Sequence, residues 1–173
     1  MRVSSQLTFC SPLEILRRTV VEQDEQKLVT RLFSLDECNV ESAQTLFFDG
    51  IISAEIISLK ENNAEVNEVM ANYQYVDVSQ TIPTQIIAVD KPLLLDFGTH
   101  STEKINQLLK QLAPALSAFS IFEIIAACTY YPGLALGKVG ALASGRNTQL
   151  ILWEGVDLVN KQIKESTRIR EII

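Results

Sequence analysis

The hydrophobic pattern of this sequence changes its period along the chain, and that change limits the folds that the chain can adopt. Residues 28–35 are typical of a strand, with Leu28, Thr30 and Leu32 on one face and Val29, Arg31 and Phe33 on the other. In residues 105–112 the apolar side chains recur at three- and four-residue spacing, which is typical of an amphipathic helix. Residues 149–153 return to a short apolar run that favours a strand, and a final strand is expected at residues 168–172. The pattern predicts a mixed α/β fold in which strands from both ends of the chain join one sheet.

Further strands and turns are expected in the first hundred residues. Asp49-Gly50 is a strong turn signal, so it predicts two separate strands on either side of it. Short strands joined by polar turns indicate an antiparallel sheet or sandwich in the first third of the chain. In the middle of the chain we expect a short helix at 64–70 and strands at 85–89 and 93–97.

The last third of the chain predicts helices with recognisable ends. Thr102 can cap the first of them. Ser120 and Glu123 form a capping-box pattern that opens a second, largely buried helix running through Cys128. A further helical turn is expected to stop at Gly137, because glycine often follows the last residue of a helix.

The composition describes one ordinary globular domain. The chain has 173 residues, a net charge of −6 and 47% hydrophobic residues, which excludes a disordered chain. Its Lys and Arg residues are scattered, whereas a nucleic-acid surface normally clusters them, so no nucleic-acid partner is expected. The N-terminus lacks a signal peptide, and the most apolar stretch, residues 119–128, is too short to span a bilayer. We therefore expect a cytoplasmic protein without membrane contact.

The side chains available for chemistry are few. His100 is the only histidine, which excludes three-histidine zinc sites and His-Glu-x-x-His helices within one chain. The sequence has neither a glycine-rich phosphate loop nor a Gly-x-Ser-x-Gly elbow. Cys10, Cys38 and Cys128 are odd in number and widely spaced, so they are interpreted as small buried hydrophobes in a reducing compartment. No metal or cofactor is predicted.

His100 lies between an expected strand and an expected helix, where α/β units often place functional groups. The simpler interpretation is a histidine in a surface loop near a helix N-terminus, which disfavours its protonated form. Both interpretations stay open on the sequence.

Both ends of the chain carry motifs with a familiar order and spacing. Residues 125–137 read Ile-Ala-Ala-Cys-Thr-Tyr-Tyr-Pro-Gly-Leu-Ala-Leu-Gly, and residues 140–147 read Gly-Ala-Leu-Ala-Ser-Gly-Arg-Asn ahead of an apolar run. Near the other end, residues 48–52 read Phe-Asp-Gly-Ile-Ile. These segments resemble the terminal parts of the amidohydrolase superfamily, in the branch of cytosine deaminases and chlorohydrolases.

The resemblance implies a composite β-sandwich of N- and C-terminal strands, but most of the catalytic barrel of that family is missing. A complete barrel usually needs roughly 250 residues, and only residues 60–95 stand where the family has most of it. The histidines of the family's His-x-His metal motif align with Lys60 and Asn62, and its metal-binding aspartate aligns with His100. No catalytic, cofactor-binding or metal-binding residue of the family is therefore carried over.

These observations predict a single domain over residues 1–173. Residues 1–59 and 148–173 would form the composite β-sandwich, and residues 60–147 would hold two or three helices and a remnant of barrel strands. The predicted function is that of a catalytically inactive, barrel-deleted relative of metal-dependent amidohydrolases with a binding or structural role. One alternative is a divergent hydrolase with a site at a subunit interface, to which His100 contributes. Another is a partner subunit for a full-length amidohydrolase.

Apolar runs also predict self-association. Residues 51–52, 56–57 and 93–95 would face the missing barrel, and large apolar patches on a soluble protein mark interaction sites. Either residues 63–92 fold back to cover them or a second copy does so, and we favour the second copy, with a two-fold homodimer as the commonest arrangement.

If His100 is a surface residue at the junction of strand and helix, His100→Ala should change the free energy of unfolding by no more than about 1 kcal/mol. Urea unfolding of the two proteins measures this difference. A loss of several kcal/mol would contradict the surface interpretation and would indicate a buried, hydrogen-bonded imidazole.

Overall fold

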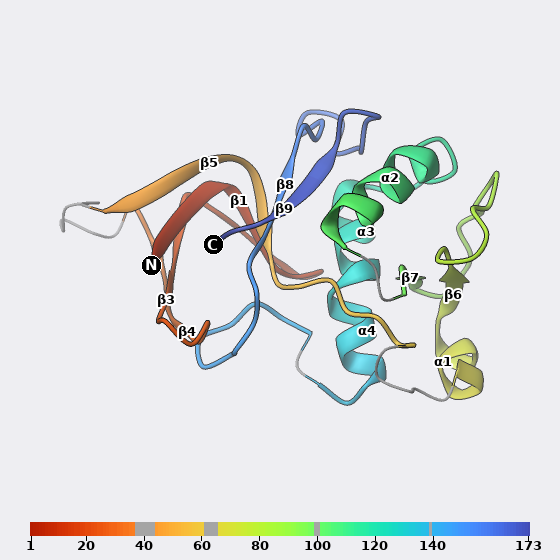
Figure 1. Ribbon diagram of the computed structural model, residues 1–173, viewed down its shortest axis with the longest axis horizontal. Coiled ribbons are helices and arrows are strands. Elements are labelled where there is room, and N and C mark those ends of the chain that lie inside the picture. The colour runs from red at the N-terminus through yellow and green to blue at the C-terminus, as the bar shows by residue number, and fades with distance from the viewer. Residues whose placement is uncertain (37–43, 61–65, 99–100, 139) are drawn as a thin grey trace.

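The computed structural model describes residues 1–36, 44–60, 66–98, 101–138 and 140–173 (Figure 1). Its strands are β1 (Arg2–Ser11), β2 (Glu14–Arg17), β3 (Thr19–Gln23), β4 (Val29–Ser34), β5 (Thr45–Ser53), β6 (Gln74–Asp77), β7 (Leu93–Asp96), β8 (Ile151–Glu154) and β9 (Arg168–Glu171). Its helices are α1 (Val66–Asn72), α2 (Thr102–Leu112), α3 (Ile121–Cys128) and α4 (Tyr130–Ala135). None of the helices in the described chain is long and apolar enough to cross a membrane.

Strands from both ends of the chain form one large sheet, as the sequence predicts. The order is β4-β3-β1-β5-β8-β9, and β2 pairs with β1. The pairing of β5 with β8 joins the N-terminal strands to the C-terminal pair β8–β9. A second sheet contains only β6 and β7, which run parallel. The mixed α/β fold with a composite sheet of N- and C-terminal strands is therefore confirmed.

The large sheet buries apolar side chains on both of its faces. Ile51 and Trp153 belong to a cluster that includes the helices, while the adjacent Ile52 and Leu152 belong to a second cluster with Val3. Consecutive residues of a strand point to opposite faces, so the doubled apolar runs are explained by burial on both sides. The runs at 51–52 and 93–95 are buried within the chain, and the run at 56–57 is buried or partly buried. These apolar runs therefore need no second copy to cover them. A homo-oligomer stays a prediction, but the apolar runs no longer support it.

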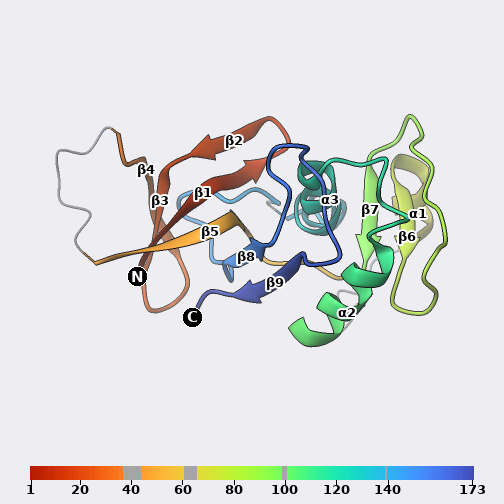
Figure 2. The same ribbon diagram turned by 90° about the horizontal axis from the view of Figure 1, so that it is seen from above.

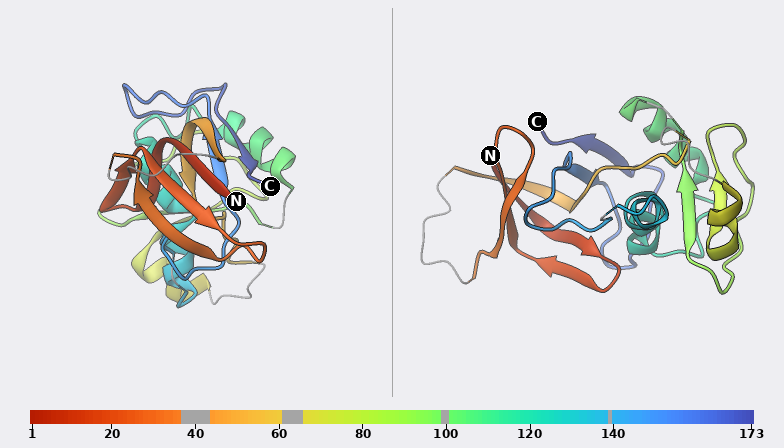
Figure 3. Two further views of the ribbon diagram at one scale, coloured as in Figure 1. Left: turned by 90° about the vertical axis from the view of Figure 1, so that its left-hand side faces the viewer. Right: turned by 90° about the horizontal axis from the view of Figure 1, so that it is seen from below.

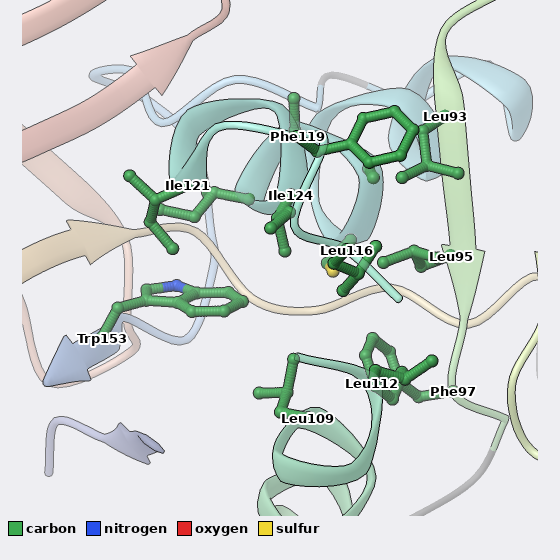
Figure 4. Close-up of a cluster of buried hydrophobic side chains, with 14 of the residues drawn as sticks. Leu93, Leu95, Phe97, Leu109, Leu112, Leu116, Phe119, Ile121, Ile124 and Trp153 are labelled. Carbon is green, nitrogen blue, oxygen red and sulfur yellow. The ribbon is translucent and has the colours of Figure 1, made fainter. Parts of the chain in front are cut away.

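Helix α3 stands between the large sheet and the β6–β7 pair (Figures 2 and 3). Six of its eight residues are buried, and it contacts both β7 and β1. Figure 4 shows Ile121 and Ile124 of α3 between Trp153 of β8 on one side and Leu95 of β7 on the other. These side chains belong to one hydrophobic cluster, so the large sheet, the helices and β7 share a core.

The helix ends follow local signals in the sequence. The Ser120 hydroxyl accepts a hydrogen bond from the Glu123 amide, and the Glu123 carboxylate accepts one from the Ser120 amide, which completes the predicted capping box. Helix α2 buries the predicted stripe of apolar residues, but Ser101 caps it in place of Thr102. Gly137 follows α4 with a φ of +65°, as expected for a residue that terminates a helix.

The prediction of a turn at Asp49-Gly50 is wrong. Strand β5 runs through both residues from Thr45 to Ser53, and Gly50 lies at an irregularity in its pairing with β1. Gly50 has a φ of +134°, and a Cβ atom at this position would collide with the carbonyl oxygen of Trp153. Glycine is needed here for a strand distortion and a close approach of β8, and not for a reverse turn.

Two further expectations about strands are corrected, and one strand was not predicted. Strand β5 pairs with β1 in parallel, so the first third of the chain is not a purely antiparallel sheet. Residues 85–89 form no strand, and the amide of the buried Ile86 instead donates to the carbonyl oxygen of Ala115. Strand β6 was not predicted, because it is only four residues long and, among the described strands, pairs with β7 alone. The predicted helix near 64–70 corresponds to α1, and the strand at 93–97 corresponds to β7.

Gly50→Ala should destabilise the protein by about 3–5 kcal/mol, because the new methyl group adds backbone strain and meets the backbone of Trp153. Gly137→Ala is the matched control, since Gly137 also has a positive φ but nothing lies within 4 Å of its added Cβ. The control should lose only about 1–2 kcal/mol. Urea unfolding of both variants measures the difference, and equal losses would contradict the close approach of β8.

Candidate functional site

Polar side chains gather where the parallel strands β6 and β7 end. Asp77 and Asp96 are the last residues of these strands and stand directly opposite each other in the pairing. The ends of neighbouring parallel strands are where α/β proteins commonly place functional side chains. Residues 58–60, which follow β5 of the large sheet, also lie at the ends of β6 and β7. There the Lys60 amide donates a hydrogen bond to the Asp96 carboxylate.

Asp96 is the centre of this group and is fully buried. Its Oδ1 accepts hydrogen bonds from the Ser58 hydroxyl and the Gly98 amide, both at 2.9 Å. Its Oδ2 accepts from the Lys60 amide and the Tyr75 hydroxyl, both at 3.2 Å. Four donors from three parts of the chain thus satisfy one buried carboxylate, which compensates for its removal from water.

Lys60 and Asp77 form an ion pair next to this carboxylate. Lys60 Nζ lies 2.6 Å from Asp77 Oδ2 and donates to the Ser79 hydroxyl at 3.0 Å. The hydroxyl and the amide of Ser79 both donate to Asp77 Oδ1. Burial alone would raise the pKa of Asp77, but the hydrogen bonds from Lys60 and Ser79 outweigh it and lower the pKa. Asp77 is therefore held as a carboxylate.

Tyr75 connects the two carboxylates electrostatically. Burial, followed by the negative charges of Asp96 and Asp77, raises the pKa of its phenol above the ordinary value. The phenol stays protonated at neutral pH and acts as a hydrogen-bond donor to Asp96. It is not poised to act as a base.

Both carboxylates of this group already have partners within the chain. A catalytic metal site keeps an open coordination position, and a general base needs a free lone pair within reach of its substrate. Here each oxygen of Asp96 and of Asp77 already accepts at least one hydrogen bond or ion pair. Within the described ranges, no group of three or more His, Cys, Asp or Glu side chains could hold a metal ion.

The residues singled out from the sequence have different outcomes. Lys60 belongs to the polar group, through its backbone and its side chain. His100, Asn62 and Cys38 lie outside the described residues. Cys10 and Cys128 are buried, as predicted. Burial, with a smaller contribution from Glu14, raises the pKa of Cys10 to about 12, and burial also raises the pKa of Cys128, so both are thiols at neutral pH.

Asp96, Asp77, Tyr75 and Ser58 were missed as a group. Asp96 had one usable signal, since it is a charged residue directly after three leucines in a predicted strand. The others are up to 38 residues away in the sequence and have no shared motif. Only the pairing of β6 with β7 brings them together.

The comparisons with known proteins add no relative. No protein-family model, no curated protein and no solved structure matches this chain.

Asp96→Asn should destabilise the protein by about 2–5 kcal/mol, because the amide nitrogen would face two donors that now share one carboxylate oxygen. Asp90→Asn is the control at an exposed position in the turn before β7, and it should change the stability by about 0.5 kcal/mol or less. Urea unfolding at neutral pH measures both values. A loss in Asp96→Asn as small as that of the control would contradict the four-donor arrangement.

Proposed function

We propose that this chain is a non-catalytic relative of the metal-dependent amidohydrolases, with a binding or structural role. The proposal rests on the resemblance of its terminal segments to that family and on the state of the polar group at the ends of β6 and β7. The observation that carries it is that the Asp96 carboxylate already accepts four hydrogen bonds from donors within the chain. A carboxylate used in this way stabilises the fold and is not free to bind a metal or a substrate.

The position of Lys60 supports the same proposal. In the resemblance, Lys60 aligns with a metal-binding histidine of the family. An ammonium group beside a carboxylate supplies a positive charge without a metal ion, and Lys60 Nζ lies 2.6 Å from Asp77. A lysine that is already ion-paired would repel a divalent cation at this position.

The arrangement of the strands is compatible with a shortened barrel. Residues 58–60 lie beside the end of β7, and β7 pairs in parallel with β6. We propose that these three segments are the remnant of barrel strands, held against the composite sheet by α3. A cytoplasmic location, a homo-oligomeric state and association with a full-length amidohydrolase stay predictions from the sequence.

Metal content and activity test the proposal. Untagged protein should contain much less than one equivalent of Zn, Fe, Mn or Ni by elemental analysis, and chelation should leave its melting temperature unchanged. With each of these metals added, it should not hydrolyse amides or remove ring amino groups from pyrimidines.

Stoichiometric metal, or a metal-dependent activity, would overturn the proposal. The divergent hydrolase with an interface site would then be favoured if the activity also disappears in His100→Ala. An activity that is equal in wild type and His100→Ala would still contradict the non-catalytic role, but it would exclude His100 from the site.

A further inference from the structure

A cavity of about 580 Å³ lies between residues 55–58 and the loop of residues 143–147. Its charged lining residues are Glu55, Lys138 and Arg146, and its apolar wall consists of Ile56, Ile57 and Ala143. The cavity is distinct from the polar group around Asp96, with which it shares only Ser58.

Arg146 presents a partly buried guanidinium to this cavity. Burial lowers its pKa, and the negative charge of Glu55 partly offsets this effect. Within the described chain its side chain makes one hydrogen bond, from Nη1 to the carbonyl oxygen of Ala141. A guanidinium has five N–H donors, so most of its capacity to bind an anion is unused.

Glu55 supplies the opposite charge on the other side of the cavity. Its side chain makes no hydrogen bond and no ion pair with any described residue, and it does not approach Arg146 within the 4 Å of a salt bridge. It is nevertheless near enough to influence the pKa of Arg146. The two charges face one cavity without neutralising each other by contact.

The backbone keeps these two residues in place. The amide of Glu55 donates to the hydroxyl of the buried Thr148. On the other side, the amide of Val29 donates to the carbonyl oxygen of Arg146, and the amide of Gly145 donates to the carbonyl oxygen of Val29. A backbone that is already held in place limits the entropy lost on binding to that of the two side chains.

We propose that this cavity binds a small aliphatic zwitterion, an amino acid whose carboxylate pairs with Arg146 and whose ammonium group pairs with Glu55. The guanidinium provides the planar pair of donors that a carboxylate prefers, and Ile56, Ile57 and Ala143 cover the methylene groups between the two charges. A simple anion would leave Glu55 without a partner, and a simple cation would leave Arg146 without one. This inference does not rest on the loss of catalysis proposed above, because it uses different side chains.

A series of amino acids of increasing length tests the inference and measures the separation of the two charges. The probes are glycine, 4-aminobutyrate and 6-aminohexanoate, and the single-charge controls are butyrate and butylamine at equal ionic strength. Calorimetric titration of the full chain should give saturable binding of at least one amino acid, at least tenfold tighter than either control. The absence of saturable binding by all three amino acids would overturn the inference.

Two variants then identify the residues that bind each end of the probe. Arg146→Gln and Glu55→Gln should each weaken binding of the best amino acid at least tenfold. Glu55→Gln should have the opposite effect on butyrate, which should bind more tightly once the opposing carboxylate is gone. Lys91→Gln, at an exposed position outside the cavity, is the matched charge control and should change neither affinity.

Binding that survives both cavity variants would place the probe elsewhere and contradict the proposed site. Binding of an amino acid by metal-free protein would support this inference and would not contradict the proposed non-catalytic role. A metal-dependent activity would contradict the non-catalytic role and would not contradict this inference.

Discussion

The burial of one short helix determines how the rest of this protein is arranged. Helix α3 is apolar around most of its circumference, so it cannot lie on the surface with one face in water. The large sheet covers one side of it and β7 covers another, while Leu109 and Leu112 of α2 complete the same cluster (Figure 4). The polar group at the end of β7 therefore occupies a position that is fixed by apolar packing, and Asp96 is buried because the strand that carries it is buried.

The sequence predicts those features of the fold that have local causes. The capping box at Ser120 and the apolar stripe of α2 require only neighbouring residues, and both were predicted correctly. Gly50 was misread because its role depends on the backbone of Trp153, which is about a hundred residues away. The candidate site was missed for the same reason, since Asp96 collects its donors from Ser58, Lys60 and Tyr75 across segments without a common motif. Long-range pairing of strands decides such features, and no short window of sequence contains it.

The two polar regions of the molecule differ in how far their charges are satisfied. Around Asp96 each charge has internal partners, so the group acts as a structural link between the large sheet and the parallel pair. At the cavity between residues 55–58 and 143–147, Arg146 and Glu55 keep unused capacity although Arg146 is partly withdrawn from water. Unsatisfied charges in a partly buried position are costly for the folded state unless a ligand compensates for them. The proposed binding site therefore lies at residues that directly follow β5, and not at the polar group around Asp96.

The pairing order of the large sheet also determines when the protein can fold. Strand β5 ends at Ser53, but its partner β8 begins at Ile151 and β9 ends at Glu171. A chain emerging from the ribosome therefore carries β1, β7 and the complete α3 sequence before Trp153 of β8 and Ile169 of β9, which share the same hydrophobic cluster, have been synthesised. Contacts between such distant residues slow folding, because a long loop must close before any of them contributes stability. While β8 and β9 are still missing, the part of this cluster that they cover is exposed and can associate with other apolar surfaces.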